Sequence, residues 1–570
     1  MKRILMIVPL LYCIMFCSAR EYLFMNGSSD YSIVISQDAK ITEKTAAQEL
    51  QYYLGRISGA KLPIATQATA RMIRIGWTPD CGKPRPEDDD QSFRYYTRNG
   101  NLYIYGGGDL GSMYGVYAFL ENELGVRWYT SEYTKLPKRK SWKLPSRNVT
   151  EKPFIQRRLD FYYDALHNPS WCAHNRLNDI HGIMDGKYGC YSSYWGIHTF
   201  FTLIPPEKYF ISHPGYFSFR NGRRINNGQL CLSNPEVLTQ LVSNLLSVIR
   251  QNPGYWCYDV SQMDNEDYCQ CHRCQSLAEK YGGQSGVMIW FVNKVANQVS
   301  KHYPNVMIGT FAYMYTRHAP ENIMPEKNVV VRLCNVECCF SHPLESLNCS
   351  YNTAFMKDLH DWSRLTNHIY IWDYAADFVE YHTPYPNFRV LGSNIRTFGE
   401  NGVVGLMEEG SHDSPWSEFS ELRQWILAKL LWNPDANVDA LAREFCLDYY
   451  GNAGMDIFDY WESVQNQVTD DTHIHFNSRC RDMWYSDEFI EEWIVKLEDA
   501  ANRCENDSVV NRRVKRVLTQ LYFVYVCRNY AASMVNGRYR ALKTILRDDP
   551  AIVRENNYDL DRYLISSGYT

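Results

Sequence analysis

The sequence predicts an α/β protein whose central part is a (β/α)8 barrel, preceded by a small α+β domain and followed by a helical domain. Strand-like apolar runs and amphipathic helices alternate about eight times over roughly 250 residues, which is the repeat number and size of such a barrel. Before it, two amphipathic helices accompany a β-hairpin, and after it the pattern is almost entirely helical. A chain of 570 residues is also too long for one compact core.

Residues 1–19 have the pattern of a signal peptide. The chain starts with a positively charged Met-Lys-Arg, residues 4–16 form a short apolar run, and a Ser-Ala pair follows at the expected cleavage site. The run is too short to span a bilayer, and no later stretch approaches twenty apolar residues. We therefore expect an exported protein without a transmembrane segment. A lipid on Cys17 is the alternative, although the bulky Phe16 fits a lipidation signal poorly.

Residues 20–150 predict the α+β domain. Apolar side chains recur at helical spacing in residues 42–57 and 113–124, and Asn99-Gly100 between two alternating runs predicts a hairpin with a type I′ turn. A G-x-G-x-x-G pattern at residues 106–111 matches a dinucleotide-binding fingerprint, but that fingerprint requires a βαβ unit rather than a hairpin. We therefore expect no nucleotide here, and instead a helix that starts close to the sheet.

The barrel is predicted in residues 151–415. Its strands are expected to be apolar runs because both faces of a parallel sheet are buried. Amphipathic helices at residues 235–250 and 286–303 lie between them. The eight predicted strands are residues 157–162, 179–184, 228–232, 257–263, 306–312, 329–334, 368–372 and 403–407.

Residues 416–570 predict a helical domain. Apolar residues recur at helical spacing in residues 418–431, 438–449, 486–502 and 509–528. This region carries no catalytic motif, and we interpret it as a domain that braces the barrel.

Composition excludes some partners. A net charge of -5 gives no electrostatic footprint for nucleic acid or for an anionic membrane surface. Aromatic residues make up 14% of the chain, which fits either a large core or a surface whose rings stack on sugars. Composition alone leaves these two interpretations open.

In a (β/α)8 barrel, the residues that carry out chemistry lie at the carboxyl ends of the strands. Reading forward from the fourth predicted strand gives Asp264 and Glu266. The other strands are followed by residues that we expect around the same mouth, as substrate-binding groups: Tyr313 and Tyr315, Glu337, Trp372, Asp373 and Tyr374, and Glu408 with Glu409, joined by Arg176, Asn178, His198 and Arg317 from neighbouring segments.

Asp264 and Glu266 are the candidate catalytic pair. Residues two apart on an extended chain share a face, and hydrolysis of a glycosidic bond needs one carboxylic acid and a second group that supplies or orients a nucleophile. Burial and a neighbouring carboxylate would raise the pKa of Glu266 and keep it protonated. In a second scheme, a 2-acetamido group of the substrate is the nucleophile and Asp264 holds it. The alternative is that these acids only cap a loop.

Three cysteines follow the two acids. Cys269, Cys271 and Cys274 lie within six residues, and a structural zinc ion would need a fourth ligand besides them. Disulfides are equally compatible with an exported chain, and buried free thiols are also possible. We expect this loop to position Asp264 and Glu266 rather than to react, and no cofactor is expected for catalysis. The His-Pro pairs at His213 and His342 are interpreted as loop and packing residues.

The chain resembles known carbohydrate-active proteins. Its amino-terminal segments 47–59 and 114–128 are similar to the non-catalytic domain before the barrel of α-glucuronidases and β-hexosaminidases. The middle of the chain resembles a family of exported Bacteroidetes proteins first catalogued as a domain of unknown function (4838-type), which includes glycoside hydrolase family 163. The similarity rests on residues 198–199, 213–217, 229–235, 260–274 and 430–434.

The resemblance implies a function for the whole chain. It implies a retaining endo-β-N-acetylglucosaminidase of N-glycans, in the periplasm or at the outer-membrane surface, with Glu266 as acid/base and Asp264 as the partner of the acetamide. In hexosaminidases these two acids are adjacent, whereas Asn265 separates them here. The alternatives are an inverting α-glucuronidase or other exo-glycosidase that uses Glu337 as its base, and a glycan-binding protein on a barrel without activity.

Overall fold

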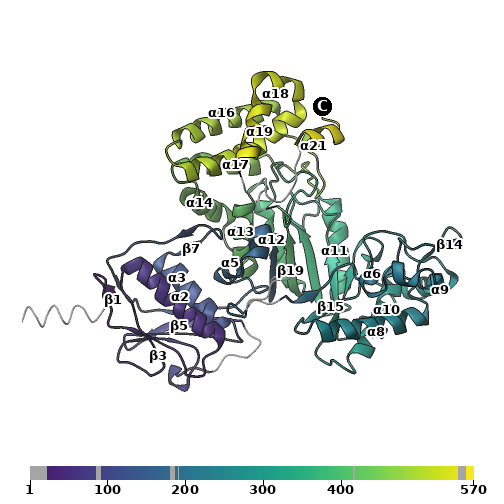
Figure 1. The fold of residues 1–570 in the computed structure, drawn as a ribbon, viewed down its shortest axis with the longest axis horizontal. Helices are drawn as coiled ribbons and strands as arrows, with labels where there is room; N and C mark the ends of the chain where they lie inside the picture. The colour runs from purple at the N-terminus through teal and green to yellow at the C-terminus, as the bar shows by residue number, and fades with distance from the viewer. Residues whose placement is uncertain are drawn as a thin grey trace, which may run out of the picture. The chain divides into compact units, whose positions relative to one another are not determined.

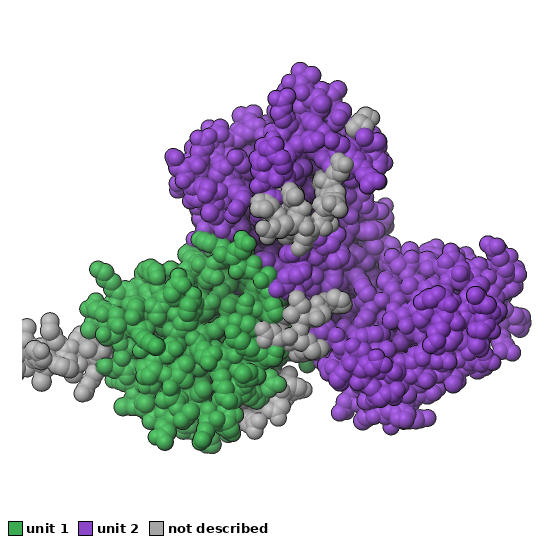
Figure 2. Space-filling model, in the orientation of Figure 1, with its two compact units in different colours: residues 1–156, 168–178, 184–190 green, residues 157–167, 179–183, 191–570 purple. Residues whose placement is uncertain are grey.

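The computed structural model describes residues 22–84, 91–179, 186–189, 192–414, 417–549 and 560–569. The predicted signal peptide lies outside these residues. The chain forms two compact units (Figure 2). The first consists of residues 1–156, 168–178 and 184–190, and the second of residues 157–167, 179–183 and 191–570.

The first unit contains a six-stranded mixed sheet. Its strand order is β10 (Asn148–Glu151), β5 (Phe93–Arg98), β6 (Asn101–Gly106), β4 (Met72–Ile75), β2 (Ser32–Val34) and β3 (Ile64–Ala65). The predicted hairpin is β5–β6, and Asn99 and Gly100 at its turn have φ of 51° and 74°, as a type I′ turn requires. Helices α2 (Ile41–Ser58) and α3 (Gly111–Leu124) match the two predicted helices (Figure 1).

Glycines bring α3 close to this sheet. A Cβ atom on Gly106 would lie 2.3 Å from the carbonyl carbon of Gly111 and 2.4 Å from the backbone oxygen of Ser92. A Cβ on Gly115 would lie 2.7 Å from Cγ2 of Ile104. The glycine pattern at residues 106–111 therefore serves helix–sheet packing, as predicted.

The second unit is built around seven described parallel strands. Their order in the sheet is β11 (Arg157–Phe161), β19 (Val403–Glu409), β18 (Ile369–Tyr374), β17 (Val329–Cys334), β16 (Met307–Ala312), β15 (Cys257–Asp259) and β12 (Tyr194–Trp195). The first strand pairs in parallel with the last, over the register Arg157–Gly405 to Phe161–Glu409, which curls the sheet toward a barrel. The predicted α/β fold class is confirmed.

The predicted second strand, residues 179–184, lies outside the described residues after Asp179. Asp179 itself lies beside β11: its backbone N–H donates to the carbonyl of Arg158 over 3.3 Å.

The predicted third strand, residues 228–232, is wrong. Its place at the edge of the sheet is taken by β12, which pairs with β15. Leu230 instead makes an isolated antiparallel bridge with Phe217, next to a small hairpin of β13 (Phe219–Arg220) and β14 (Arg223–Arg224). The apolar run at 228–232 thus reflects burial in this excursion from the barrel and not in the barrel sheet.

Helices follow the strands as predicted, starting with α8 (Pro235–Gln251) and α10 (Gln284–Val299) and continuing with α11 (Ser350–Ser363) and α12 (Phe388–Glu400). The Asn234 side chain caps α8 by accepting a hydrogen bond from the backbone of Glu236 at 3.0 Å. None of the described helices is long and apolar enough to cross a membrane.

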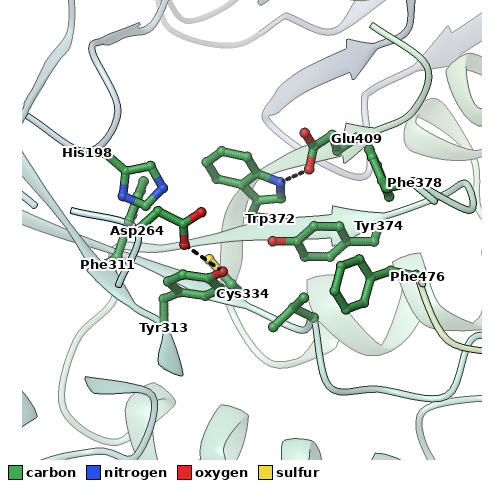
Figure 3. Close-up of a pocket in the computed structure, with 11 residues that line it drawn as sticks. His198, Asp264, Phe311, Tyr313, Cys334, Trp372, Tyr374, Phe378, Glu409 and Phe476 are labelled. Carbon is green, nitrogen blue, oxygen red and sulfur yellow. Dashed lines mark hydrogen bonds between the residues drawn. The ribbon is translucent and has the colours of Figure 1, made fainter. Parts of the chain in front are cut away.

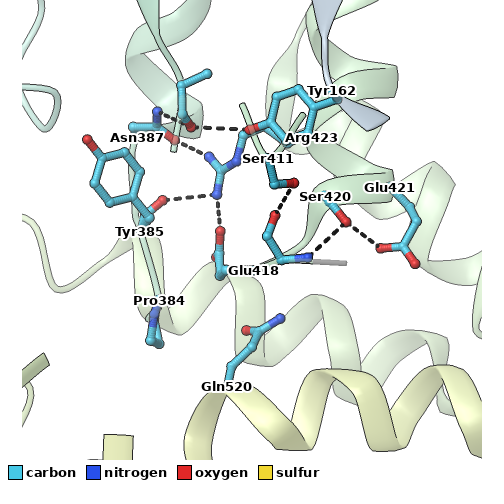
Figure 4. Close-up of polar contacts among 12 residues, drawn as sticks. Tyr162, Pro384, Tyr385, Asn387, Ser411, Glu418, Ser420, Glu421, Arg423 and Gln520 are labelled. Atoms are coloured by element: carbon cyan, nitrogen blue, oxygen red, sulfur yellow. Dashed lines mark hydrogen bonds and ion pairs between the residues drawn. The ribbon is translucent and has the colours of Figure 1, made fainter. Parts of the chain in front are cut away.

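The carboxyl-terminal helices belong to the same unit as the sheet. They are α13 (Ser420–Trp432), α14 (Val438–Tyr449), α15 (Gly454–Gln465), α16 (Asp487–Arg503), α17 (Ser508–Arg528), α18 (Tyr530–Asn536), α19 (Arg538–Asp548) and α21 (Leu560–Ser566). Figure 4 shows how α13 is anchored. The buried guanidinium of Arg423 pairs with Glu418 and donates to the side chain of Asn387 and to the carbonyl of Tyr385, so α13 is tied to the segment that leads into α12.

Candidate active site at the carboxyl ends of the barrel strands

An open cavity of about 240 Å³ lies at the carboxyl ends of strands β16 to β19. The strands contribute alternate residues, because successive side chains of a strand point to opposite faces. Its lining is shown in Figure 3 and consists of His198, Asp264, Phe311, Tyr313, Cys334, Val336, Trp372, Tyr374, Phe378, Glu409 and Phe476. The sequence-predicted residues that the cavity brings together are therefore Asp264, Tyr313, Trp372, Tyr374, Glu409 and His198.

Asp264 enters the cavity opposite the Tyr313 ring (Figure 3). The Tyr313 hydroxyl donates to Oδ1 of Asp264 over 3.1 Å. Burial, and then the Asp264 carboxylate, raise the pKa of Tyr313, so its hydroxyl stays protonated and remains a donor. This contact fixes the direction of the Asp264 carboxyl and leaves its second oxygen facing the cavity side.

A buried glutamine holds the backbone before Asp264. The Gln229 side chain accepts from the N–H of Met263 at 2.9 Å and donates to the carbonyl of Met263 at 2.8 Å. It also donates to the carbonyl of Asn265 at 2.8 Å. Gln229 belongs to the residues on which the family resemblance rests, but its role as a clamp on this loop was not predicted from the sequence.

Glu409, the last residue of β19, lies on the other side of Trp372 from Asp264 in Figure 3. The indole N–H of Trp372 donates to its Oε2 over 2.6 Å. Burial raises the pKa of Glu409 to about 7, the Trp372 hydrogen bond opposes this shift, and Asp413 adds to it. A carboxyl with this pKa can both give and accept a proton near neutral pH.

Aromatic rings form most of the remaining wall. Trp372 and Tyr374 are stacked with ring centroids 6.4 Å apart, and Tyr374 contacts Phe378 and Phe476 at 5.6 and 5.7 Å. Phe378 and Phe476 come from loops that the sequence did not single out. None of the described residues that line the cavity is Lys or Arg. The described lining therefore offers ring faces and carboxyls, but no fixed positive charge.

Glu266 lies on the loop beside Asp264 and is exposed as Asp264 is, but it is not part of the described lining. Its side chain makes no hydrogen bond or ion pair with the described residues. Because catalytic contacts often tighten only when substrate binds, this position alone does not decide its role. Its assignment as acid/base stays a prediction.

Three further predicted residues lie outside the lining. Glu337 forms an ion pair of 3.0 Å with Arg317, which also pairs with Asp358. The ring of Tyr315 packs against Tyr268 with centroids 5.1 Å apart. The structure places Arg176 in the first unit, where its guanidinium lies 2.9 Å from the Glu121 carboxylate.

Asp373 and Glu408 lie on the opposite face of the sheet from the cavity. Register pairs Asp160 with Glu408 and Glu408 with Asp373, so the three carboxyls form a row across β11, β19 and β18. On the same face, the Arg158 guanidinium lies 5.2 Å from the Trp432 ring of α13. We call Asp160, Glu408 and Asp373 the carboxyl row.

The carboxyl row is buried, and burial dominates its chemistry. Burial, then Asp373 and Asp160, raise the pKa of Glu408 well above its usual range, and burial raises the pKa of Asp373 to about 6. Neither carboxyl oxygen of Glu408 has a hydrogen-bond partner among the described residues. Burial thus shifts these carboxyls toward their protonated forms, and the row faces the helices instead of the cavity.

Cys269, Cys271 and Cys274 are joined by Cys231 in a four-thiol cluster. The Sγ of Cys231 lies 3.7 Å from that of Cys271 and 3.9 Å from that of Cys274, and all four sulfurs lie within 4.8 Å of one another. None of the four is in a disulfide, and the backbone N–H of Phe219 donates to Cys269 at 3.3 Å. Cys231 lies 38 residues before Cys269, so the motif alone did not reveal it.

Known structures share the fold at low sequence identity. A family GH115 4-O-methyl-α-glucuronidase, BtGH115A, is similar with a TM-score of 0.63 and 11% identity, over 94% of this chain and 79% of that chain. A family 89 glycoside hydrolase from Clostridium perfringens, in complex with PUGNAc, is similar with a TM-score of 0.51 and 11% identity. The match covers 89% of this chain and 65% of that enzyme, a little under two thirds of its length. CpGH84D is similar with a TM-score of 0.50 and 10% identity, over 94% of this chain and 91% of that chain.

These likenesses show that the fold is one that glycoside hydrolases use. None of the curated proteins matches the sequence. One family model does match, over residues 128–462, which is more than half of the chain and includes the β11 to β19 sheet and the described cavity lining except Phe476. The chain belongs to the family described as a domain of unknown function, DUF4838.

Proposed function

We propose that this protein is a glycoside hydrolase that binds a neutral 2-acetamido sugar in the cavity at the strand ends. The observation that carries the proposal is the pair Asp264 and Glu409 in one aromatic-walled cavity, in different environments. Asp264 is fixed by a hydrogen bond from Tyr313, whereas Glu409 is buried and has a pKa of about 7. Two carboxyls in different environments are what acid-assisted cleavage of a glycosidic bond requires.

The cavity wall favours a neutral sugar over an anionic one. A uronate carboxylate would need a cation or a set of N–H donors, and the described lining contains no Lys or Arg. The lining instead offers the Trp372 and Tyr374 rings, whose faces suit the C–H face of a sugar ring. This argues for a neutral sugar and against the α-glucuronidase alternative, although the fold is shared with an α-glucuronidase.

In the proposed reaction, the Asp264 carboxylate accepts the N–H of the substrate's acetamide and turns its oxygen toward C1. The acetamide oxygen forms a bond to C1 while the bond from C1 to the leaving oxygen breaks, and protonated Glu409 gives its proton to that oxygen. Glu409, now a carboxylate, then takes a proton from the water that opens the cyclic intermediate at C1. The two displacements at C1 together retain the anomeric configuration.

Two finer points rest on the family resemblance. Endo cleavage within N-glycans is one of them. The structures of similar fold also include a glycoside hydrolase in complex with 2-acetamido-1,2-dideoxynojirimycin. The other is the role of Glu266. The geometry favours Glu409 as acid/base because Glu409 lines the cavity and Glu266 does not.

The test is incubation of the purified protein with a panel of high-mannose and complex N-glycoproteins, chitooligosaccharides and a glucuronoxylan. We expect mass spectrometry to detect glycans released from the acetamido substrates only, and NMR early in the reaction to show a β product. Release from the glucuronoxylan, or an inverted product, would contradict the proposal. Binding of glycans with no turnover of any panel member would support a binding protein instead.

We also propose that the four-thiol cluster binds one structural zinc ion through Cys231, Cys269, Cys271 and Cys274. Tetrahedral zinc with Zn–S bonds of about 2.3 Å places its sulfurs roughly 3.8 Å apart, and the two distances from Cys231 are 3.7 and 3.9 Å. These distances are far longer than a disulfide bond of about 2.05 Å. Such an ion would fix the loop that carries Asp264, and an elemental analysis of the purified protein tests for it.

A further inference from the structure

A second cluster of sulfur and nitrogen ligand atoms shares no residue with the described cavity lining. It consists of Cys339, His342, Cys349 and His473, whose ligand atoms all lie within 4.8 Å of one another. Three of them come from the segment between β17 and α11, and His473 comes from the segment after α15, more than 120 residues later. We call these four residues the Cys2His2 cluster.

The distances within the cluster suit tetrahedral zinc. Nδ1 of His342 lies 3.5 Å from Sγ of Cys339, and Nδ1 of His473 lies 3.9 Å from Sγ of Cys349. Zinc bonds of about 2.3 Å to sulfur and about 2.05 Å to nitrogen, at a tetrahedral angle, place the two ligand atoms roughly 3.6 Å apart. Both cysteines are free thiols in the structure.

A hydrogen bond orients His342 as a ligand. Its Nε2 lies 3.0 Å from the carbonyl oxygen of Thr469. A carbonyl can only accept, so Nε2 carries the hydrogen, and in the neutral ring the lone pair is then on Nδ1, which faces Cys339. Zinc-binding histidines commonly donate their other N–H to a backbone carbonyl in this way.

The cluster also has the burial of a structural metal site. Cys339, His342 and Cys349 are buried, and His473 is exposed. Zinc binds cysteine as thiolate, so binding here would release the thiol protons to solvent.

We infer that Cys339, His342, Cys349 and His473 bind a second structural zinc ion, which fastens the segment around His473 to the loop after β17. Backbone contacts already align the two segments: the N–H of Phe340 donates to the carbonyl of Ile474 at 2.8 Å. The same segment carries Phe476, whose backbone carbonyl accepts from the N–H of Phe378 at 2.7 Å and whose ring lines the cavity. The ion would thus help to position part of the cavity wall without being part of that wall.

The test is the zinc content of the full-length protein, purified without chelator and measured by elemental analysis. We expect two zinc ions per chain, falling to one in His473→Ala and in Cys349→Ser. His473→Cys keeps a zinc ligand and should restore the second ion. His475→Asn is the matched control, because the His475 ring contacts the Cys338 carbonyl rather than the cluster, and it should keep both ions.

A second measurement does not depend on any variant. Cobalt loaded into the wild-type protein should give the visible absorption of tetrahedral cobalt with mixed sulfur and nitrogen ligands, in addition to that of a four-sulfur site.

Unchanged zinc content in both His473→Ala and Cys349→Ser would overturn the inference, as would a Cys339–Cys349 disulfide found by mass spectrometry of the unreduced protein. Because the readout is metal content, the result is independent of whether the protein cleaves glycans.

Discussion

Glu408 and Glu409 are neighbours at the end of β19, yet they lie on opposite faces of the sheet and in different chemical settings. Glu409 lines the cavity, accepts a hydrogen bond from Trp372, and has a pKa of about 7. Glu408 faces the helices between Asp160 and Asp373 and has no hydrogen-bond partner among the described residues. Both are buried acids with raised pKa values, so a raised pKa alone does not identify a catalytic group; access to the cavity does.

The largest effect is expected at Asp264, the other acid of the cavity face. Asp264→Asn keeps the shape but removes the carboxylate that would accept the acetamide N–H. We expect kcat to fall by about 10³ or more on the substrate identified by the glycan panel, since correct placement of the nucleophile contributes strongly to such reactions. The check is a steady-state assay with circular dichroism to show an unchanged fold. A variant with more than a tenth of the wild-type rate would remove Asp264 from the mechanism.

The pH dependence should also follow the cavity face. Glu409 acts in its protonated form, and its pKa of about 7 means that the protonated fraction falls as the pH rises through this value. We expect kcat/KM to decline by about tenfold per unit on the alkaline side of pH 7. A pH–rate profile from pH 5 to 9 measures this. A rate that stays constant up to pH 9 would show that Glu409 is not the acid.

Glu266 sharpens the comparison because it lies outside the described cavity lining and on neither face of β19. If Glu409 is the acid/base, Glu266→Gln should lower the rate by less than about tenfold. General acid catalysis contributes about 10² to 10⁴, so a loss of that size in Glu266→Gln would restore the assignment that the family resemblance implies. The same steady-state assay as for Asp264→Asn decides between Glu409 and Glu266 as the acid/base.

The smallest effect on activity is expected at Glu408, on the helix-facing side of the sheet. A change there should instead alter stability. The folded-state pKa of Glu408 is raised above its unfolded value, so its contribution to stability is fully present below an unfolded pKa of about 4.3 and is lost as the pH rises toward and through its folded pKa. The neutral side chain in Glu408→Gln should escape this loss. We expect a higher Tm than wild type at pH 8 and a smaller difference at pH 4.5, measured by calorimetry; a variant less stable than wild type at both values would contradict this.

The sequence predicted the architecture better than the direction of its side chains. Near-continuous apolar runs located β11, β15, β16, β17, β18 and β19 to within a few residues. The same continuity hid the alternation of faces: in Val403–Glu409 almost every residue is buried, so nothing in the pattern distinguishes the face of Glu408 from that of Glu409. The run at residues 228–232 was misplaced for a related reason, because burial in a loop excursion looks the same as burial in a strand.

The candidate site was predicted in part. Asp264, Tyr313, Trp372, Tyr374 and Glu409 were expected at the mouth because they end or follow predicted strands, and the cavity lining includes them. His198, expected there from a neighbouring segment, also lines the cavity. Contacts between distant segments were beyond reach. Cys231, His473 and Phe476 come from segments far from their partners in sequence, and no local spacing marks them.

The most direct test of the account compares Glu409→Gln with Glu408→Gln on one cleaved substrate. Both changes remove one ionisable group from adjacent positions of the same strand, so they differ mainly in the face that they alter. We predict that kcat/KM falls by about 10² to 10⁴ in Glu409→Gln and stays within about threefold of wild type in Glu408→Gln. Equal losses in the two variants, or a larger loss in Glu408→Gln, would contradict the assignment of the chemistry to the cavity face.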